Sequence, residues 1–183
     1  MRRTSFTIAM MIAAAFTLVF VSTPMAQQQL SNPRIVVHKS ARKLKLYDGR
    51  KIVKTYNIVL GSSPVGDKQV EGDGRTPEGD FYVFVKNDKS SFTVSLGVSY
   101  PSTDDAKRGH KAQLIKALEE QEIRTAIERK SMPLQKTKLG GEIYIHGGGT
   151  ERDWTDGCIA LTDSDIVELF SLAKTGMPVK ILP

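Results

Sequence analysis

Short runs of apolar or alternating residues, typical of β-strands, recur along most of the chain. Eight such runs occur, at 34–38, 43–47, 51–59, 81–85, 92–96, 142–146, 158–161 and 179–182. Alternation with period two is clearest in 43–47, and Asp48-Gly49 directly after it is a hairpin signal. The pattern therefore predicts a mainly β fold built from about eight short strands.

Two segments instead carry apolar residues at helical intervals. Residues 110–130 are rich in helix-forming residues and predict one helix, or two short ones, inserted between strands. The insert either forms a lid over a cleft or simply packs its apolar face. After 158–161, Thr162 and Asp165 resemble a capping box, which predicts a second helix whose apolar face includes Ile166 and Leu169.

The first 26 residues have the layout of a secretory signal peptide. Arg2 and Arg3 precede an apolar run over 6–21, and small and polar residues follow it. The run is shorter than the roughly 20 residues that a membrane-spanning helix needs, so an uncleaved anchor is the less favoured alternative. We expect export to the periplasm or cell envelope, with residues 34–183 forming one domain.

Composition narrows the classes of function. The chain has 183 residues, of which 40% are apolar and 25% charged, as in one globular domain. Removing residues 1–26 leaves 24 basic and 20 acidic residues, a net charge of +4. This mild charge suits an acidic substrate, but no basic stripe with interleaved aromatic residues indicates nucleic-acid binding. No heptad or repeat appears, so we expect a monomer.

Cys158 is the single cysteine of the chain. Exported proteins normally pair their cysteines in disulfides, so an unpaired one is either a reactive thiol or a small buried apolar residue. His146 precedes it by twelve residues, across a glycine-rich loop that contains Gly147 and Gly148. A hairpin-like connection would bring the imidazole to the thiol, and a nearby imidazole favours the thiolate. The amides of Gly157 and Cys158 are then candidates for an oxyanion hole.

Other chemistries fit less well. A metal site at His146, Asp156 and Cys158 lacks the fourth ligand of a structural zinc centre, so we expect no metal or cofactor. His38 and His110 are expected to be surface residues. The loop 72–79 lacks the Gly-Lys-Ser/Thr ending of a phosphate loop, and it is interpreted as a wall of the cleft or a structural bend.

His146-Gly147, followed by Thr155-Asp156-Gly157-Cys158-Ile159, resembles the signature of the L,D-transpeptidases with a YkuD-type catalytic domain. Segments 61–68, 71–79, 99–101 and 139–141 also occur in the order typical of that family, so the resemblance covers about 34–183. It implies a β-sandwich-like domain with helices at its edge. It also implies attack on the L,D amide of a peptidoglycan tetrapeptide stem, thioester formation, and transfer to an amine of another stem. Some members attach a lipoprotein to the wall, and relatives release it by hydrolysis.

The resemblance also implies roles for individual residues. Cys158 would be the nucleophile, His146 the general base, and the Gly147 carbonyl would orient the imidazole. The amides of Gly157 and Cys158 would hold the oxyanion. Four residues would contact the substrate: Tyr100, Gly148, Thr155 and Asp156.

The chain departs from the commonest family motif at three positions. Thr155 replaces a serine, Asp156 replaces a histidine, and Ala160 replaces an arginine. Without that arginine a bidentate partner for a stem carboxylate is missing, and Asp156 should raise the pKa of the Cys158 thiol. Transfer between stems, hydrolysis of an L,D or lipoprotein–wall amide, and a non-catalytic wall-binding domain therefore remain as alternatives. The third is least favoured, because a reactive thiol is a liability without a use.

Overall fold

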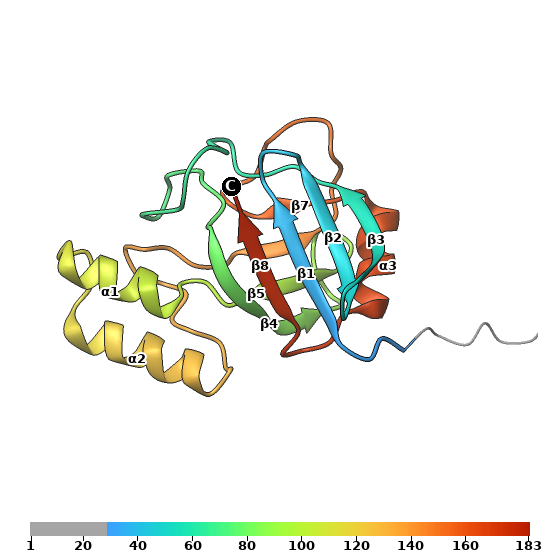
Figure 1. Cartoon of the computed structure of the whole chain (residues 1–183). Coiled ribbons are helices and arrows are strands. Elements are labelled where there is room, and N and C mark those ends of the chain that lie inside the picture. The colour runs from blue at the N-terminus through green and yellow to red at the C-terminus, as the bar shows by residue number, and fades with distance from the viewer. Residues whose placement is uncertain (1–28) are drawn as a thin grey trace, which may run out of the picture.

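The computed structural model describes residues 29–183 and places eight strands and three helices within them (Figure 1). The predicted signal peptide lies outside the described residues. The strands are β1 Pro33–His38, β2 Lys43–Asp48, β3 Lys51–Asn57, β4 Gly79–Asn87, β5 Ser95–Val98, β6 Tyr144–His146, β7 Ile159–Ala160 and β8 Pro178–Leu182. The helices are α1 Thr103–Lys111, α2 Ala117–Glu128 and α3 Asp163–Leu172. The predicted mainly β fold is confirmed.

All eight strands belong to one curled sheet with the order β3-β2-β1-β8-β4-β5-β6-β7. The long strand β4 links its two halves, because residues 79–82 pair with β8 whereas Val83 and the residues after it pair with β5. An irregularity in register between Val83 and Val85 marks this change of partner. β-bulges of this kind bend a strand, and the two halves of the sheet thereby face each other across the core.

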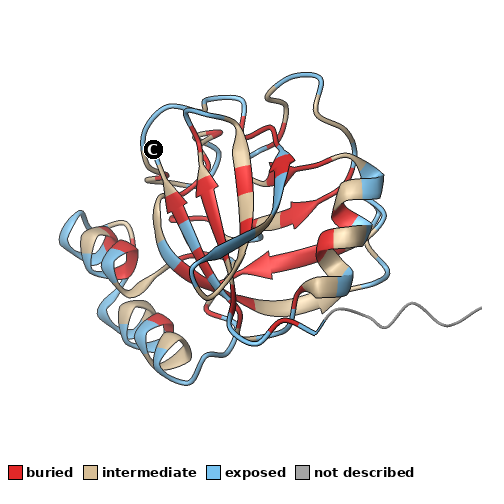
Figure 2. Cartoon of the chain, turned by 45° about the vertical axis from the view of Figure 1, so that its right-hand side comes forward, coloured by how far each residue is buried: buried red, intermediate tan, exposed pale blue. Residues whose placement is uncertain are grey.

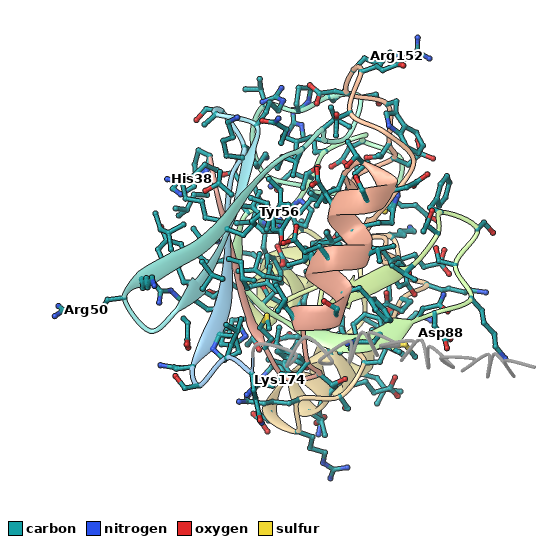
Figure 3. The ribbon with its side chains drawn as sticks, turned by 90° about the vertical axis from the view of Figure 1, so that its right-hand side faces the viewer. His38, Arg50, Tyr56, Asp88, Arg152 and Lys174 are labelled. Atoms are coloured by element: carbon teal, nitrogen blue, oxygen red, sulfur yellow. The ribbon has the colours of Figure 1, made fainter. Side chains whose placement is uncertain are left out.

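The core lies between the two halves of the sheet and α3 (Figure 2). The alternation in β2 buries Leu44 and Leu46, as predicted, and Tyr56 of β3 is buried near α3 (Figure 3). α3 begins as the sequence predicts, because the Thr162 hydroxyl accepts a hydrogen bond from the Asp165 amide, and Ile166 on its inner face is fully buried.

The helical insert is a pair of helices that starts earlier than predicted. Ser102 and Asp105 form a capping box at the start of α1, so the expected boundary at residue 110 was wrong and the alternative of two short helices is correct. The pair packs around a small apolar cluster of its own, which includes Ala106, Ile123 and Leu139. It lies to one side of the sheet (Figure 1). Within residues 29–183, no helix has both the length and the apolar character needed to cross a membrane.

The strands that bear the candidate residues are adjacent, but their connection is not hairpin-like. β6 and β7 run parallel, with Ile145 level with Ile159 and His146 level with Ala160. The expected hairpin-like geometry is therefore wrong, because residues 147–158 cross over before the chain re-enters the sheet. Since alternate residues share a face, Cys158, just before β7, and His146 still lie on the same face. Strand β5 also begins later than predicted, at Ser95.

Candidate active site

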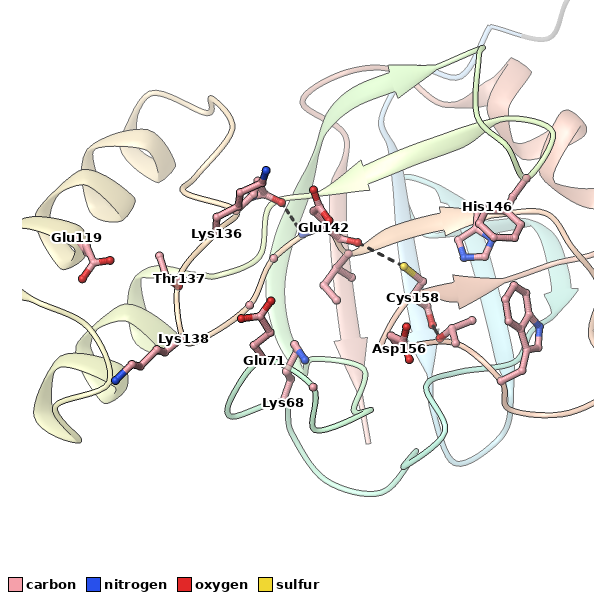
Figure 4. Close-up of a pocket in the computed structure, with 18 residues that line it drawn as sticks. Lys68, Glu71, Glu119, Lys136, Thr137, Lys138, Glu142, His146, Asp156 and Cys158 are labelled. Atoms are coloured by element: carbon pink, nitrogen blue, oxygen red, sulfur yellow. Dashed lines mark hydrogen bonds between the residues drawn. The ribbon is translucent and has the colours of Figure 1, made fainter.

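A cavity of about 920 Å³ opens over this face of the sheet (Figure 4). His146 and Cys158 lie toward one end of it, and Glu119 of α2 lies at the other. Its wall comes from two loops, around 68–72 and 135–143, together with the segment 154–158. Charged side chains of both signs line it: Lys68, Lys136, Lys138, Glu71, Glu119, Glu142 and Asp156. Among residues 29–183, no group of three His, Cys, Asp or Glu residues is arranged to hold a metal ion.

The Cys158 thiol rests between two backbone groups. Its Sγ donates to the Glu142 carbonyl at 3.4 Å and accepts from the Tyr144 amide at 3.4 Å, and Figure 4 shows the first of these contacts. Burial raises the pKa of this thiol to about 11; the Tyr144 amide opposes that rise and the charge of Asp156 adds to it. The thiol is therefore the resting form.

The carbonyl that receives the thiol is held by an unusual backbone conformation. Glu142 has φ +53°, in the left-handed region that residues other than glycine rarely adopt. Its amide donates to Oε1 of Gln135 at 2.7 Å, while Nε2 of Gln135 donates to the carbonyls of Pro133 and Tyr100. Gln135 thus braces the loop that presents the Glu142 carbonyl to Cys158.

His146 is buried at the end of β6, between two aromatic rings. Phe92 stacks on the imidazole with centroids 4.6 Å apart, and Trp154 meets it at 5.7 Å with its ring nearly perpendicular. Nδ1 lies 2.6 Å from the Gly147 carbonyl, which can only accept, so Nδ1 carries the proton and Nε2 is left as an acceptor. Burial lowers the pKa of His146, partly offset by the Gly147 carbonyl. No hydrogen bond joins His146 to Cys158 within the described part of the chain.

Thr155 organises the backbone next to the thiol. Its hydroxyl donates to the Cys158 carbonyl at 2.8 Å and accepts from the Gly157 amide at 3.2 Å. Gly157 has φ +128°, and a Cβ there would lie 2.7 Å from the Arg75 carbonyl, so the position requires glycine. Of the two amides predicted to hold an oxyanion, that of Gly157 is thus already engaged. The Cys158 amide has no acceptor among residues 29–183.

The four residues predicted to contact a substrate divide in two. Thr155 and Asp156 line the cavity. Tyr100 does not: it is fully buried, with its hydroxyl donating to the Leu139 carbonyl at 2.9 Å, and the prediction was wrong because the side chain supports the cavity loop from within. Gly148 is exposed but lies outside the cavity lining, and its amide donates to Asp163.

The two other histidines and the loop 72–79 take no part in the thiol–imidazole pair of the site. His110 is exposed on α1, and His38 is half-buried at the end of β1 near the periphery (Figure 3). Of the loop 72–79, interpreted as a wall of the cleft or a structural bend, only Gly72 lines the cavity, next to Glu71. Lys68, almost fully buried, steadies this loop by bonding to the Asp73 carboxylate at 2.9 Å.

Sequence reasoning missed the aromatic walls and the brace. Trp154 directly precedes the recognised motif, and a large aromatic residue in a glycine-rich loop was an available signal. Phe92 was predicted to be the first residue of a strand, whereas it precedes β5 and stacks on His146. Gln135 carries no sequence signal, because its role depends on the turn between 133 and 142.

Comparisons with solved structures find proteins of similar fold. The crystal structure of the helical cell shape determining protein Pgp2 from Campylobacter jejuni matches with TM-score 0.57 and 22% identity, covering 82% of this chain and 47% of that one. Bd1075 from Bdellovibrio bacteriovorus matches with TM-score 0.52 and 19% identity, covering 84% and 48%. The chain spans about half the length of these proteins, and such likeness shows the fold alone. No curated protein matches the sequence.

A family model gives the assignment itself. The model described as the L,D-transpeptidase catalytic domain, YkuD, matches residues 32–181, which is most of the chain. This range contains all eight strands apart from the last residue of β8, and it contains the whole cavity. The chain therefore belongs to the YkuD family of L,D-transpeptidase catalytic domains.

Proposed function

We propose that this chain is an exported peptidoglycan L,D-transpeptidase that uses Cys158 as a nucleophile and His146 as its general base. One observation carries the proposal. The single thiol of the chain and an imidazole whose Nε2 has no hydrogen-bond partner among residues 29–183 share one cavity. A thiol beside a base of this kind is the arrangement of covalent acyl transfer. The predicted signal peptide supports a site of action in the cell envelope.

The reaction begins from a protonated thiol. Rotation about the Cα–Cβ bond of Cys158 moves Sγ away from the Glu142 carbonyl and toward His146. Nε2 takes the thiol proton as Sγ attacks the amide carbonyl of the stem peptide. The Cys158 amide stabilises the oxyanion, joined by the Tyr144 amide, which now points at Sγ.

Collapse of the tetrahedral intermediate completes acyl transfer to the enzyme. The C–N bond breaks, the leaving amine takes the proton from His146, and a thioester remains on Cys158. An amine of a second stem then attacks the thioester, and His146 removes its proton. The new amide leaves, and the thiolate takes that proton back.

The substrate class follows from the family and from the charges of the cavity. A stem peptide carries both carboxylates and amines, and both lysines and acidic side chains line the cavity wall. Its volume lies within the range of about 300–1,000 Å³ that is usual for small-ligand sites.

Hydrolysis is the second candidate, and Ala160 favours it. This residue is fully buried and bridges to Val59, so it offers no cation where the family commonly has an arginine. A contact to a stem carboxylate is absent at that position. Water as acceptor would convert the same thioester into shortened stems, or would release a wall-linked lipoprotein.

Purified protein incubated with tetrapeptide-rich sacculi tests both candidates, with products read by mass spectrometry. New cross-links support transpeptidation, whereas shortened stems or freed lipoprotein support hydrolysis. The matched control is Cys158→Ala, which keeps the fold and removes the nucleophile. Products that persist at the same level with Cys158→Ala would refute the assignment.

A further inference from the structure

One peptide unit connects the imidazole of His146 to a carboxylate that the mechanism does not use. The Gly147 carbonyl accepts from Nδ1 of His146 at 2.6 Å, and the amide of the next residue, Gly148, donates to Oδ1 of Asp163 at 3.0 Å. The carbonyl and N–H of a trans peptide point in opposite directions. The peptide plane therefore lies between the imidazole and the carboxylate, with one hydrogen bond on each side.

The same carboxylate oxygen also holds the turn that carries Phe92, the residue whose ring stacks on His146. Thr93 donates its hydroxyl to Oδ1 of Asp163 at 2.8 Å, and the neighbouring Phe92 carbonyl accepts from the Gly147 amide at 3.1 Å. The ring of Phe92 stacks on His146. Thr93 has φ +72°, which is rare for a β-branched residue, so this turn is held in place by its contacts.

The close approach of Asp163 also depends on the glycine at position 147. A Cβ on Gly147 would lie 2.3 Å from Oδ1 of Asp163 and 3.0 Å from the Phe92 carbonyl. Real Cβ atoms essentially never show the shorter of these two contacts, the one with Asp163. The absence of a side chain at this position is what lets the carboxylate reach the Gly148 amide.

We propose that Asp163 is a positioning residue for the catalytic base, acting through the peptide unit between Gly147 and Gly148. The proposal rests on the function proposed above for His146. By fixing the Gly148 amide, Asp163 aims the Gly147 carbonyl at Nδ1 and keeps the proton there, so that Nε2 stays free. Its negative charge also polarises the peptide, because a hydrogen-bonded chain of dipoles strengthens each of its members.

A purely structural role must be distinguished from this one. Asp163 is the first residue of α3, where any acidic side chain interacts favourably with the helix N-terminus. Asp165 lies in the same turn, and its carboxylate contacts neither His146 nor the loop 147–148. The variant Asp165→Asn is therefore a matched control that removes the same charge from the same helix end.

The test measures the tautomer of His146 by ¹H–¹⁵N NMR at about pH 8.5, where an ordinary imidazole is neutral. The native chain, Asp163→Asn, Asp163→Ala and Asp165→Asn are compared. We expect the Nδ1–H form in the native chain and in Asp165→Asn, a mixture of tautomers in Asp163→Ala, and partial rescue by Asp163→Asn, which keeps an acceptor oxygen. Turnover of stem peptides should fall about tenfold in kcat for Asp163→Ala with KM unchanged, which is less than the roughly 10²–10⁴-fold that a general base contributes, because His146 itself stays in place.

The outcomes separate this inference from the proposed function. A native Nδ1–H tautomer that persists unchanged in Asp163→Ala overturns the inference, even if the protein turns over stem peptides. An equal change in Asp165→Asn overturns it too, because the effect would then be that of the helix end. A tautomer shift confined to the Asp163 variants upholds the inference, even if sacculi remain unaltered and the proposed function fails.

Discussion

Alkylation of Cys158 by iodoacetamide should be slow at neutral pH and should accelerate with a midpoint near pH 11. Burial raises the pKa of this thiol from 9.0 to about 11, and the charge of Asp156 contributes to the rise. Two pKa units correspond to about a hundredfold less thiolate than an ordinary thiol has at neutral pH. Because the thiolate is the reacting form, the alkylation rate should be lower by about the same factor.

The assay is direct, because Cys158 is the single cysteine and each alkylation adds one mass increment. The protein unfolded in urea provides the control, with the midpoint of a free thiol. Asp156→Asn should move the folded midpoint downward, since that charge raises the pKa. A rate that already levels off below about pH 7 would reveal a resting thiolate–imidazolium pair, as in low-pKa catalytic thiols, and would refute the mechanism proposed here.

Three further perturbations test the packing around the site. Lys39→Met should lower the free energy of unfolding by about 3–5 kcal/mol in urea titrations, because the buried ammonium pairs with Glu78 at 2.8 Å and its removal leaves that carboxylate without its partner. A decrease of less than about 1 kcal/mol would contradict this. Trp154→Ala should expose His146 to solvent and raise its pKa, so the acid limb of the pH–rate profile should move to higher pH. A move to lower pH would show that burial is not the cause of the lowered pKa. Gly61→Ala should lower the free energy of unfolding by about 1–3 kcal/mol or more in the same titrations, because its Cβ would lie 2.1 Å from the Gly74 carbonyl. An unchanged free energy of unfolding would show that the backbone can move to relieve this contact.

Features that depend on local sequence were predictable. The alternation in 43–47 and the cap at Thr162 are local signals, and both elements form as expected. The pair of Cys158 and His146 was recognised from a lone cysteine and neighbouring glycines, and both residues line the same cavity. The start of α1 was missed although Ser102 and Asp105 encode its capping box, because the turn that follows is charged rather than apolar.

Features that depend on tertiary contacts could not be predicted from the pattern. The parallel pairing of β6 with β7 is set by where the crossover 147–158 returns, and no residue in that loop specifies the direction. Tyr100 was assigned to the substrate through the family resemblance alone, yet its side chain is buried and its hydroxyl donates to the Leu139 carbonyl. The contact of Asp163 with the Gly148 amide joins the start of α3 to a loop fifteen residues earlier and leaves no sequence signature.

The central claim is that Cys158 forms a thioester with a peptidoglycan stem. Trapping this intermediate tests it most directly: the protein is mixed with a purified tetrapeptide stem, quenched in acid and examined by intact-mass spectrometry. We predict an adduct equal to the stem without its terminal residue, located on Cys158, which is absent from Cys158→Ala and accumulates less in His146→Ala. The same adduct on Cys158→Ala, or turnover of the stem without any adduct on Cys158, would contradict the account.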